Sequence, residues 1–269
     1  MTRDGCHYAG SPEWSVAYEH GYLIASGGAD EVYSVEDVSS QTAAELAELW
    51  EHPLDRERLS PDAARVVQQL LSVGAVVRDL EPRPPARIAL AFCGAQEATF
   101  VDALSAEAGG ERLWRLAEAR DEELTLVVRT GGRLVEMSDG TDHPVSGPHL
   151  LLDTAYHHTL SLGPLVFPGE TACLACLAGR IGQYWGDPVP PARPAARRWA
   201  RLAAALAALE LDKIAAGDYG LVNATVAFDL GRHEVKRNAL YKLPWCPVCG
   251  DRERGQTVGL VPLPWVEAA

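Results

Sequence analysis

Two Cys-x-x-Cys pairs near the carboxyl end constrain this chain more than any other feature: Cys173-Leu-Ala-Cys176 and Cys246-Pro-Val-Cys249. Two thiolates three positions apart on a tight turn can hold one tetrahedral metal ion, so each pair is half of a zinc site. The pairs are separated by sixty-nine residues, 177–245, far more than in a zinc finger. We therefore expect one zinc ion, held by all four cysteines, to join two distant stretches of a domain.

Four cysteine ligands fill the coordination shell and leave no position for a reactive water, so the expected zinc is structural. Two unrelated thiol pairs, or one redox-active pair, are the alternatives. The remaining cysteines are Cys6 and Cys93, and Cys93 follows the apolar run Ile88–Phe92, where a buried core thiol is expected. In a reducing cytoplasm this arrangement favours metal over disulfides.

Composition and charge exclude several classes of protein. The 269 residues are 47% hydrophobic, as in globular proteins, and exceed one small domain. Lys and Arg number 24 against 37 Asp and Glu, a net charge of −13 that disfavours nucleic acids and anionic membranes. The sequence shows neither a signal peptide nor an apolar run near the ~20 residues of a membrane span. We expect a cytoplasmic protein.

Residues 1–83 have the pattern of a small winged helix-turn-helix domain. Strands are predicted at 22–24 and 31–35, with a turn at Ser26-Gly27-Gly28 between them. Thr42 and Glu45 fit a capping box at the start of a helix that ends before Pro53. Ser60-Pro61-Asp62 begins a second helix, and its apolar face is predicted from the spacing of Ala63, Val66, Val67, Leu70 and Leu71. Gly74 and a strand at 75–77 close the domain, before a linker with Pro82, Pro84 and Pro85.

Winged helices bind DNA or peptides, and the charges favour peptides here. Arg65 is the only basic residue of the second helix, beside Gln68 and Gln69, whereas phosphate recognition takes several Lys or Arg on one face. An exposed strand edge at 30–35 can instead accept a strand from a peptide, next to a helix that lines a side-chain groove. A domain with only a packing role is the remaining alternative.

Residues 84–269 alternate predicted strands with helices, which indicates an α/β domain. The apolar run Arg87–Phe92 is typical of a buried parallel strand, and a helix ending near Ala106 follows it. Further strands are predicted at 124–128, 133–137 and 150–152, with a helix at 113–116. The turn after Phe92 has one glycine and the carboxylate of Glu97, without the Gly-x-Gly-x-x-Gly that lets a backbone approach phosphate. We therefore expect no nucleotide.

The region between the cysteine pairs predicts a long helix and a hairpin. The Ala- and Leu-rich segment 195–216 is predicted to be one helix ended by Gly217, with close burial of its alanines against the sheet and a helical repeat of Leu202, Leu206 and Leu209. Segments 221–229 and 233–240 are predicted to form a hairpin turning at Gly231-Arg232. His157-His158 and Ser161 lack the partners of a nucleophile site, so a self-sufficient catalyst is not expected.

The stretch Gly163–Leu177, including Pro168-Gly169-Glu170-Thr171-Ala172-Cys173, and the stretch Trp245–Gly250 resemble the zinc-carrying half of E1-like (ThiF-like) proteins. The predicted winged helix in front of them resembles the leader-peptide recognition element of peptide-modifying systems. Together they resemble the "ocin-ThiF-like" partners of YcaO cyclodehydratases, which act in azole-containing peptide and thiopeptide biosynthesis. The resemblance implies a winged-helix recognition domain, residues 1–83, and a degenerate E1-like Rossmann-type domain with structural zinc, residues 84–269.

The resemblance implies that the chain binds the leader of a ribosomal precursor peptide. It would present the core to a separate YcaO enzyme, which uses ATP to form thiazolines or oxazolines. The leader would add as a strand, so the implied peptide-binding residues are Glu31, Val32, Tyr33, Ser34, Val35, Arg65, Gln68 and Gln69. A homodimer is a further possibility. Two alternatives stay open: an adenylating enzyme of the E1 class with an unrecognised nucleotide pocket, and a zinc-containing winged-helix regulator.

Overall fold

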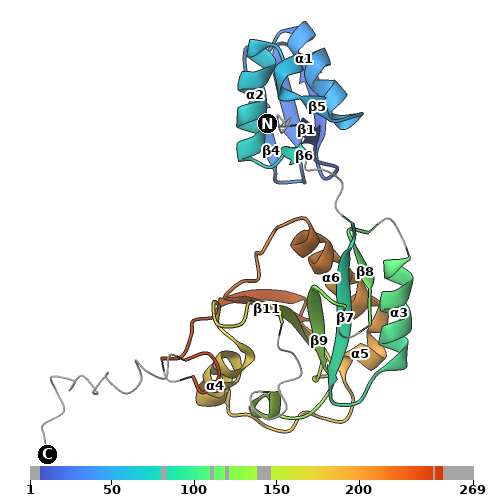
Figure 1. Cartoon of the computed structure of the whole chain (residues 1–269), viewed down its shortest axis with the longest axis vertical. Coiled ribbons are helices and arrows are strands. Elements are labelled where there is room, and N and C mark those ends of the chain that lie inside the picture. Colours follow the sequence, from blue (N-terminus) through green and yellow to red (C-terminus); the bar gives the residue numbers. More distant parts are fainter. Residues whose placement is uncertain are drawn as a thin grey trace, which may run out of the picture. The chain divides into compact units, whose positions relative to one another are not determined.

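The computed structural model describes residues 7–79, 84–109, 112–118, 121–137, 147–244 and 246–250. The chain divides into two compact units, Met1–Arg83 and Pro84–Ala269, and each is described by itself (Figure 1). Cys6 and the predicted linker residue Pro82 lie outside the described residues. No helix in the described ranges is long and apolar enough to cross a membrane.

The first unit consists of two small antiparallel sheets and two helices. One sheet has the strand order β5-β1-β6 and the other β2-β3-β4. The elements are β1 (His7–Gly10), β2 (Ser15–Glu19), β3 (Tyr22–Ser26), β4 (Val32–Val35), α1 (Ser40–Ala47), β5 (Leu54–Asp55), α2 (Pro61–Ser72) and β6 (Val76–Asp79). The predicted strands at 22–24, 31–35 and 75–77 are thus found, within a residue or two. The short strands β1, β2 and β5 were not predicted.

The helices of this unit begin at serines. Ser60 caps α2 by accepting the N–H of Ala63, with Pro61 at the first turn, as predicted. The predicted capping box at Thr42 is wrong, because Ser39 is the cap of α1 and accepts the N–H of Thr42. Glu45 does not reach back within its own helix. Its carboxylate accepts hydrogen bonds from the backbone N–H and hydroxyl of Ser60, at 2.6 and 2.7 Å, and so joins α1 to the start of α2.

The core of the first unit is the apolar face of α2 packed with α1 and the strands. Val66, Val67 and Leu70 of α2 are fully buried, and so is Leu46 of α1. Leu71, predicted for the same face, is only partly buried. Arg65 and Gln68 lie on the exposed side of this helix.

The second unit is a seven-stranded sheet in the order β13-β12-β11-β10-β9-β7-β8. Strands β8, β7, β9 and β10 are parallel, whereas β11, β12 and β13 pair antiparallel. The strands are β7 (Ala86–Cys93), β8 (Trp114–Leu116), β9 (Leu124–Arg129), β10 (His149–Asp153), β11 (Thr159–Val166), β12 (Ala224–Asp229) and β13 (Glu234–Ala239). The parallel part, with a helix after β7, is consistent with a Rossmann-like fold, and the predicted α/β class is confirmed.

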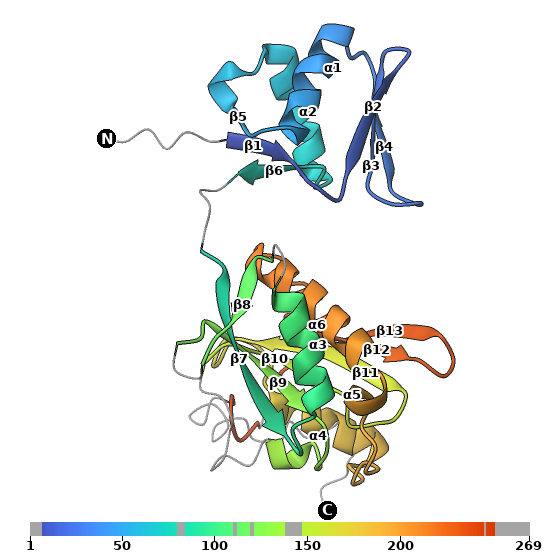
Figure 2. The same ribbon diagram turned by 90° about the vertical axis from the view of Figure 1, so that its right-hand side faces the viewer.

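Helices cover both faces of this sheet (Figure 2). They are α3 (Ala98–Ala108), α4 (Leu174–Trp185), α5 (Ala195–Arg198) and α6 (Ala200–Ala215). Side chains alternate along β9, so Leu126 and Val128 join the core under α3 and α6, whereas Val127 joins the core under α4. Cys173, Cys176 and Cys246 belong to this second core.

Three predictions for the second unit are wrong. Residues 114–116 form edge strand β8, because the parallel pairing with β7 overrides the helical pattern. Residues 135–137 form a 3-10 turn, and Leu134 and Val135 are held there by the carboxylate of Asp187 at 2.9 Å each. The predicted single helix at 195–216 is interrupted at Trp199 and forms α5 and α6. Strand β11 was not predicted.

The alanines of α6 pack inward as predicted, whereas Leu202 and Leu209 face outward. Ala203, Ala204, Ala207 and Ala208 are fully buried, which brings the helix backbone close to the sheet. Leu202 and Leu209 are 39% and 47% exposed. The predicted hairpin is confirmed as β12 and β13, which turn through Gly231.

Candidate metal centre and peptide-binding surface

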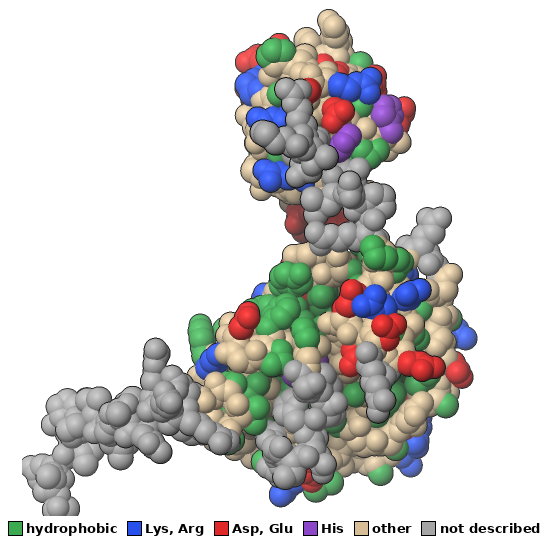
Figure 3. All heavy atoms as spheres, viewed as in Figure 1, with side chains coloured by type: hydrophobic (Ala, Val, Ile, Leu, Met, Phe, Trp, Pro, Cys, Tyr) green, Lys and Arg blue, Asp and Glu red, His purple; other side chains and the backbone are tan. Residues whose placement is uncertain are grey.

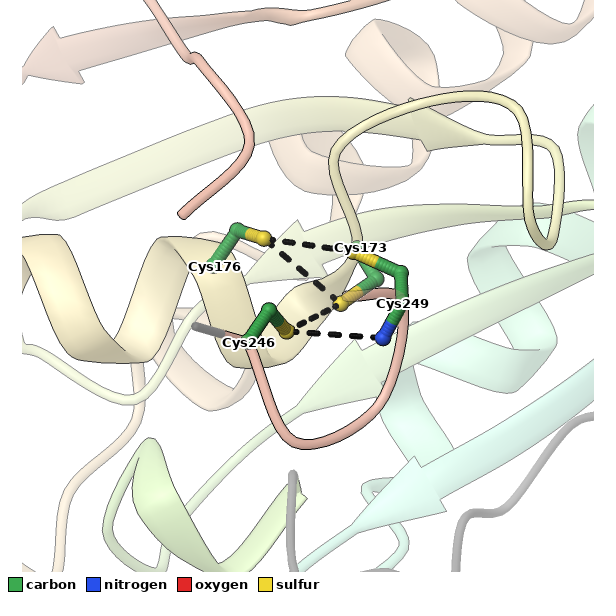
Figure 4. A group of neighbouring side chains, drawn as sticks. All are labelled: Cys173, Cys176, Cys246 and Cys249. Atoms are coloured by element: carbon green, nitrogen blue, oxygen red, sulfur yellow. Dashed lines mark hydrogen bonds between the residues drawn. The ribbon is translucent and has the colours of Figure 1, made fainter. Parts of the chain in front are cut away.

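The two Cys-x-x-Cys pairs meet beneath the sheet. Cys173 is the residue before the first turn of α4, and Cys176 lies within that turn. Cys246 and Cys249 lie on a second tight turn, closed by a hydrogen bond from the N–H of Gly250 to the carbonyl of Cys246. A side chain at Gly250 would clash with this carbonyl, since a Cβ there would lie 2.3 Å from it. Figure 4 shows the four sulfur atoms directed toward one another.

The sulfur positions fit a tetrahedral metal ion. All four Sγ atoms lie within 4.8 Å of one another. The separations are 3.8 Å for Cys173–Cys176, 3.5 Å for Cys173–Cys246 and 3.4 Å for Cys176–Cys249. Zinc–sulfur bonds of ~2.3 Å in a tetrahedron place the sulfur atoms roughly 3.8 Å apart. The four cysteines are therefore placed for a structural metal site, with the ligands predicted from sequence.

Hydrogen bonds around the cluster favour thiolate at one sulfur. The pKa of Cys176 is lowered to about 4, first by the hydrogen bond with the Cys173 thiol and further by the backbone N–H of Leu243, 3.3 Å from Cys176 Sγ. Burial raises the pKa of Cys249 to about 11. Because metal binding requires thiolates, a metal ion would displace the protons of the other cysteines. Leu243 thus supports the site from outside the ligand set.

The predicted peptide-binding residues occupy two elements of the first unit. Val32, Tyr33, Ser34 and Val35 form β4, and Glu31 lies immediately before it, in the turn from β3. Among the described residues, strand β4 is an edge of the sheet β2-β3-β4 and pairs with β3 alone. Val32 is 61% exposed, whereas Val35 is buried in the core. One edge of β4 is therefore open.

The other three predicted residues lie on α2. Arg65 and Gln68 are exposed, and Gln69 is half-buried. Gln69 Oε1 is buried without a hydrogen-bond partner among the described residues. Strand β4 and α2 border the same core, but no hydrogen bond joins the residues predicted on one to those predicted on the other.

The ends of the parallel strands hold polar residues that sequence reasoning missed. Arg129, at the end of β9, is fully buried and donates to Asp153 Oδ2 at 2.8 Å and to the carbonyl of Gly132 at 2.6 Å. Arg197 of α5 binds both carboxylate oxygens of Glu97, at 2.9 and 3.1 Å, just before α3. A polar residue directly after an apolar strand, as Arg129 is after Leu124–Val128, was the available signal.

Cys93 packs against the core that contains the cysteine cluster, as predicted, but it is only partly buried. It ends β7, next to the Arg129–Asp153 pair, and burial raises its pKa while Arg129 lowers it. The adjacent histidines His157 and His158 do not converge on a site. The Nδ1 atom of His157 bonds with the carbonyl of Arg193 at 2.7 Å.

Charged side chains are mixed on the molecular surface. On the face shown in Figure 3, acidic and basic groups are interspersed on both units, without a broad basic area. On α2, Arg65 remains the only basic residue.

Comparison with known proteins identifies the fold. No protein-family model matches the chain, and no curated protein matches it. Among solved structures, a heterocyclase in complex with substrate and cofactor is similar with a TM-score of 0.60 and 17% identity, over 91% of this chain and 40% of its own. The heterocyclase TruD is similar with a TM-score of 0.58 and 20% identity, over 96% of this chain and 45% of TruD. MccB of E. coli is similar with a TM-score of 0.55 and 12% identity, over 91% of this chain and 97% of MccB.

These alignments extend into both units, because the first 83 residues are too many to fall within the unmatched remainder. The chain spans less than half of the heterocyclases and nearly all of MccB. At such low identity the similarity establishes a shared fold. The chain thus has the fold found in heterocyclases and in MccB, with four clustered cysteines.

Proposed function

We propose that this chain binds the leader segment of a ribosomal precursor peptide and presents its core to a separate YcaO-type cyclodehydratase. The observation that carries the proposal is the open edge of β4 in a chain that shares its fold with heterocyclases. One of those heterocyclases was solved with its substrate, and MccB was solved with MccA. The first unit acts as the winged-helix recognition domain implied by the sequence.

The register of β4 supports strand addition by a peptide. The N–H of Gly27 donates to the carbonyl of Glu31, which fixes the alternation of hydrogen bonds between β3 and β4. By that alternation, Tyr33 and Val35 bond to β3, while the backbone N–H and carbonyl groups of Val32 and Ser34 face away from it. A peptide strand could bond to these two residues without disturbing the sheet.

Residues on α2 add side-chain recognition to the proposed site. The Arg65 guanidinium is exposed and would pair with a carboxylate of the leader. Gln69, half-buried on the same helix, would line the groove beside it. Gln68 is exposed on the same helix one turn from Arg65 and completes the set.

The metal in this proposal is one structural zinc held by Cys173, Cys176, Cys246 and Cys249. The donor set of four sulfurs favours zinc over the harder cations, which prefer oxygen ligands. The zinc would hold the start of α4 and the 246–249 turn together and supply no open coordination position. The cysteines themselves would take no part in peptide chemistry.

The geometry of the β7–α3 turn supports a chain without its own nucleotide. A Cβ at Gly94 would lie 2.7 Å from the backbone nitrogen of Gly131, so the turn is already packed against the next strand end. Glu97 places a carboxylate before α3, at the helix end that would otherwise attract phosphate. The cyclising chemistry is thus assigned to the partner enzyme.

Fluorescence polarisation with a labelled leader peptide tests the proposed function. We expect saturable binding by the zinc-loaded chain alone, weakened about tenfold by Arg65→Glu, since one charge-assisted hydrogen bond is lost. Arg56→Glu, an exposed arginine outside α2, is the control with the same charge change and should bind like the wild type. A wild-type chain with no affinity for the leader would refute the function. Pyrophosphate exchange with ATP by the isolated chain would favour the adenylating alternative instead.

A further inference from the structure

A large groove of the second unit lies on the side of the sheet opposite the cysteines. It has a volume of about 940 Å³, and its walls are α3 on one side and the α5–α6 corner on the other. These helices lie together on one face of the sheet (Figure 2). The lining includes small residues, among them Ala103, Ala106 and Ala200. The groove is wide enough for a peptide segment with side chains.

The α5–α6 wall of this groove is basic, in contrast to the chain as a whole. Residues 188–209 contain four arginines and no Asp or Glu, although the net charge of the protein is −13. Arg197 is paired with Glu97, but Arg198 and Arg201 have no ion pair among the described residues. Arg198 instead stacks on Trp199 at 5.1 Å from the ring centre. Two unpaired guanidinium groups therefore face this groove.

The α3 wall carries less available charge. Glu107 is already bound by Arg112, which also binds Asp212 at 2.6 Å. Asp102 is the remaining carboxylate among the described residues that line the groove. An occupant that follows the α5–α6 wall would thus meet two unpaired arginines and would approach one carboxylate on the opposite wall. This balance favours acidic over basic segments.

Apolar side chains lie beside these arginines. Trp199 is 36% and Leu202 39% exposed, and the row continues along the solvent side of α6 to Leu209. The alanines on the inward side of α6 make its contacts with the core, so this exposed row is free to contact a partner. Tryptophan and arginine are the residue types that most often dominate binding energy at protein interfaces.

We propose that the α3–α5–α6 groove docks an acidic, partly apolar segment of the separate cyclising enzyme. This inference rests on the proposed function. The heterocyclases that share the fold are more than twice as long as the matched part, so each contains a large region that this chain lacks. If a separate protein supplies such a region here, this chain needs a surface that holds it. Carboxylates of the docked segment would pair with Arg198 and Arg201, and its apolar side chains would contact Trp199 and Leu202.

The test measures two affinities in the same zinc-loaded, full-length preparation: for the cyclodehydratase encoded with this chain, by biolayer interferometry, and for the leader peptide. The variant is Arg198→Glu/Arg201→Glu. Its control is Arg232→Glu/Lys236→Glu, which makes the same charge change on the exposed β12–β13 hairpin. Arg198→Gln/Arg201→Gln repeats the test with a smaller disturbance, and thermal melts establish that each variant folds.

We expect the Glu variant to lose at least about tenfold in affinity for the cyclodehydratase, with a smaller loss for the Gln variant and none for the control. Leader binding should stay at the wild-type level in all three. Wild-type affinity of both groove variants for the cyclodehydratase, or an equal loss in the hairpin control, would overturn the groove assignment alone. A wild-type chain that does not bind the leader peptide would instead refute the proposed function.

Discussion

Glu45 of α1 binds Ser60 of α2 with both carboxylate oxygens, one to the backbone N–H and one to the hydroxyl. The same Ser60 hydroxyl caps α2 by accepting the N–H of Ala63, so the Glu45 carboxylate is linked through Ser60 to the first turn of α2. Glu45→Ala should lower the stability of the first unit by about 1–3 kcal/mol, because hydrogen bonds to a charged group are lost at a helix start. Urea unfolding followed by circular dichroism measures the change. Glu48→Ala, whose side chain is 56% exposed, should cost less than about 0.5 kcal/mol.

The four-cysteine cluster predicts one zinc ion per chain in protein purified without chelator. Cys246→Ser should lose the zinc and lower the melting temperature of the second unit, because the 246–249 turn is no longer joined to α4. Elemental analysis and thermal melts measure both effects. Cys93→Ser, which lies outside the cluster, should keep a full zinc content. A zinc-free wild type of unchanged stability would contradict the structural role.

The buried pair of Arg129 and Asp153 predicts a large cost for removing one partner. Asp153→Ala leaves the fully buried guanidinium without its counter-charge, and we expect a loss of about 3–5 kcal/mol in unfolding free energy. Asp121→Ala removes the exposed partner of Arg87 and should cost less than about 1 kcal/mol. Equal losses in the two variants, measured by urea titration, would show that the Arg129 pair has no special role.

Because of Glu210 on α6, we expect the stability of the protein to fall as the pH rises. Burial raises the pKa of this carboxyl in the folded chain, with Lys213 and Arg237 opposing the shift. The folded state therefore binds this proton more tightly than the unfolded state does. As the pH rises above the unfolded-state pKa, deprotonation lowers the free energy of unfolding, and the charged carboxylate destabilises the fold at neutral pH. Glu210→Gln should melt at a higher temperature than the wild type at pH 8, and the difference should vanish near pH 4. Glu170→Gln, an exposed position, should show no such pH-dependent gain.

Much of the fold followed from local patterns in the sequence. Helix α2 was predicted from Ser60, Pro61 and its apolar spacing, because cap and periodicity agree there. Strand β7 was predicted from the near-continuous apolar run Arg87–Phe92, which is typical of a parallel strand inside a sheet. Strand β8 was mistaken for a helix, since three residues at a sheet edge are specified by their pairing with β7 and not by their own pattern.

The candidate sites were predictable to different degrees. The cysteine ligands were visible because each pair is a local motif, although only the fold brings residues seventy positions apart to within 4.8 Å. The Arg129–Asp153 and Glu97–Arg197 pairs were missed, because each joins residues far apart in the sequence. The burial of the α6 alanines was predicted from composition, because small side chains let a helix lie close to a sheet.

Peptide binding at β4 is tested most directly by changing one backbone group. Ser34→Pro removes the N–H that faces away from β3 while leaving the bonds between β3 and β4 in place. Ser34→Ala keeps that N–H and removes only the hydroxyl. In fluorescence polarisation with the leader peptide, we expect wild-type affinity for Ser34→Ala and at least about a tenfold loss for Ser34→Pro. Wild-type affinity of a folded Ser34→Pro chain would contradict it.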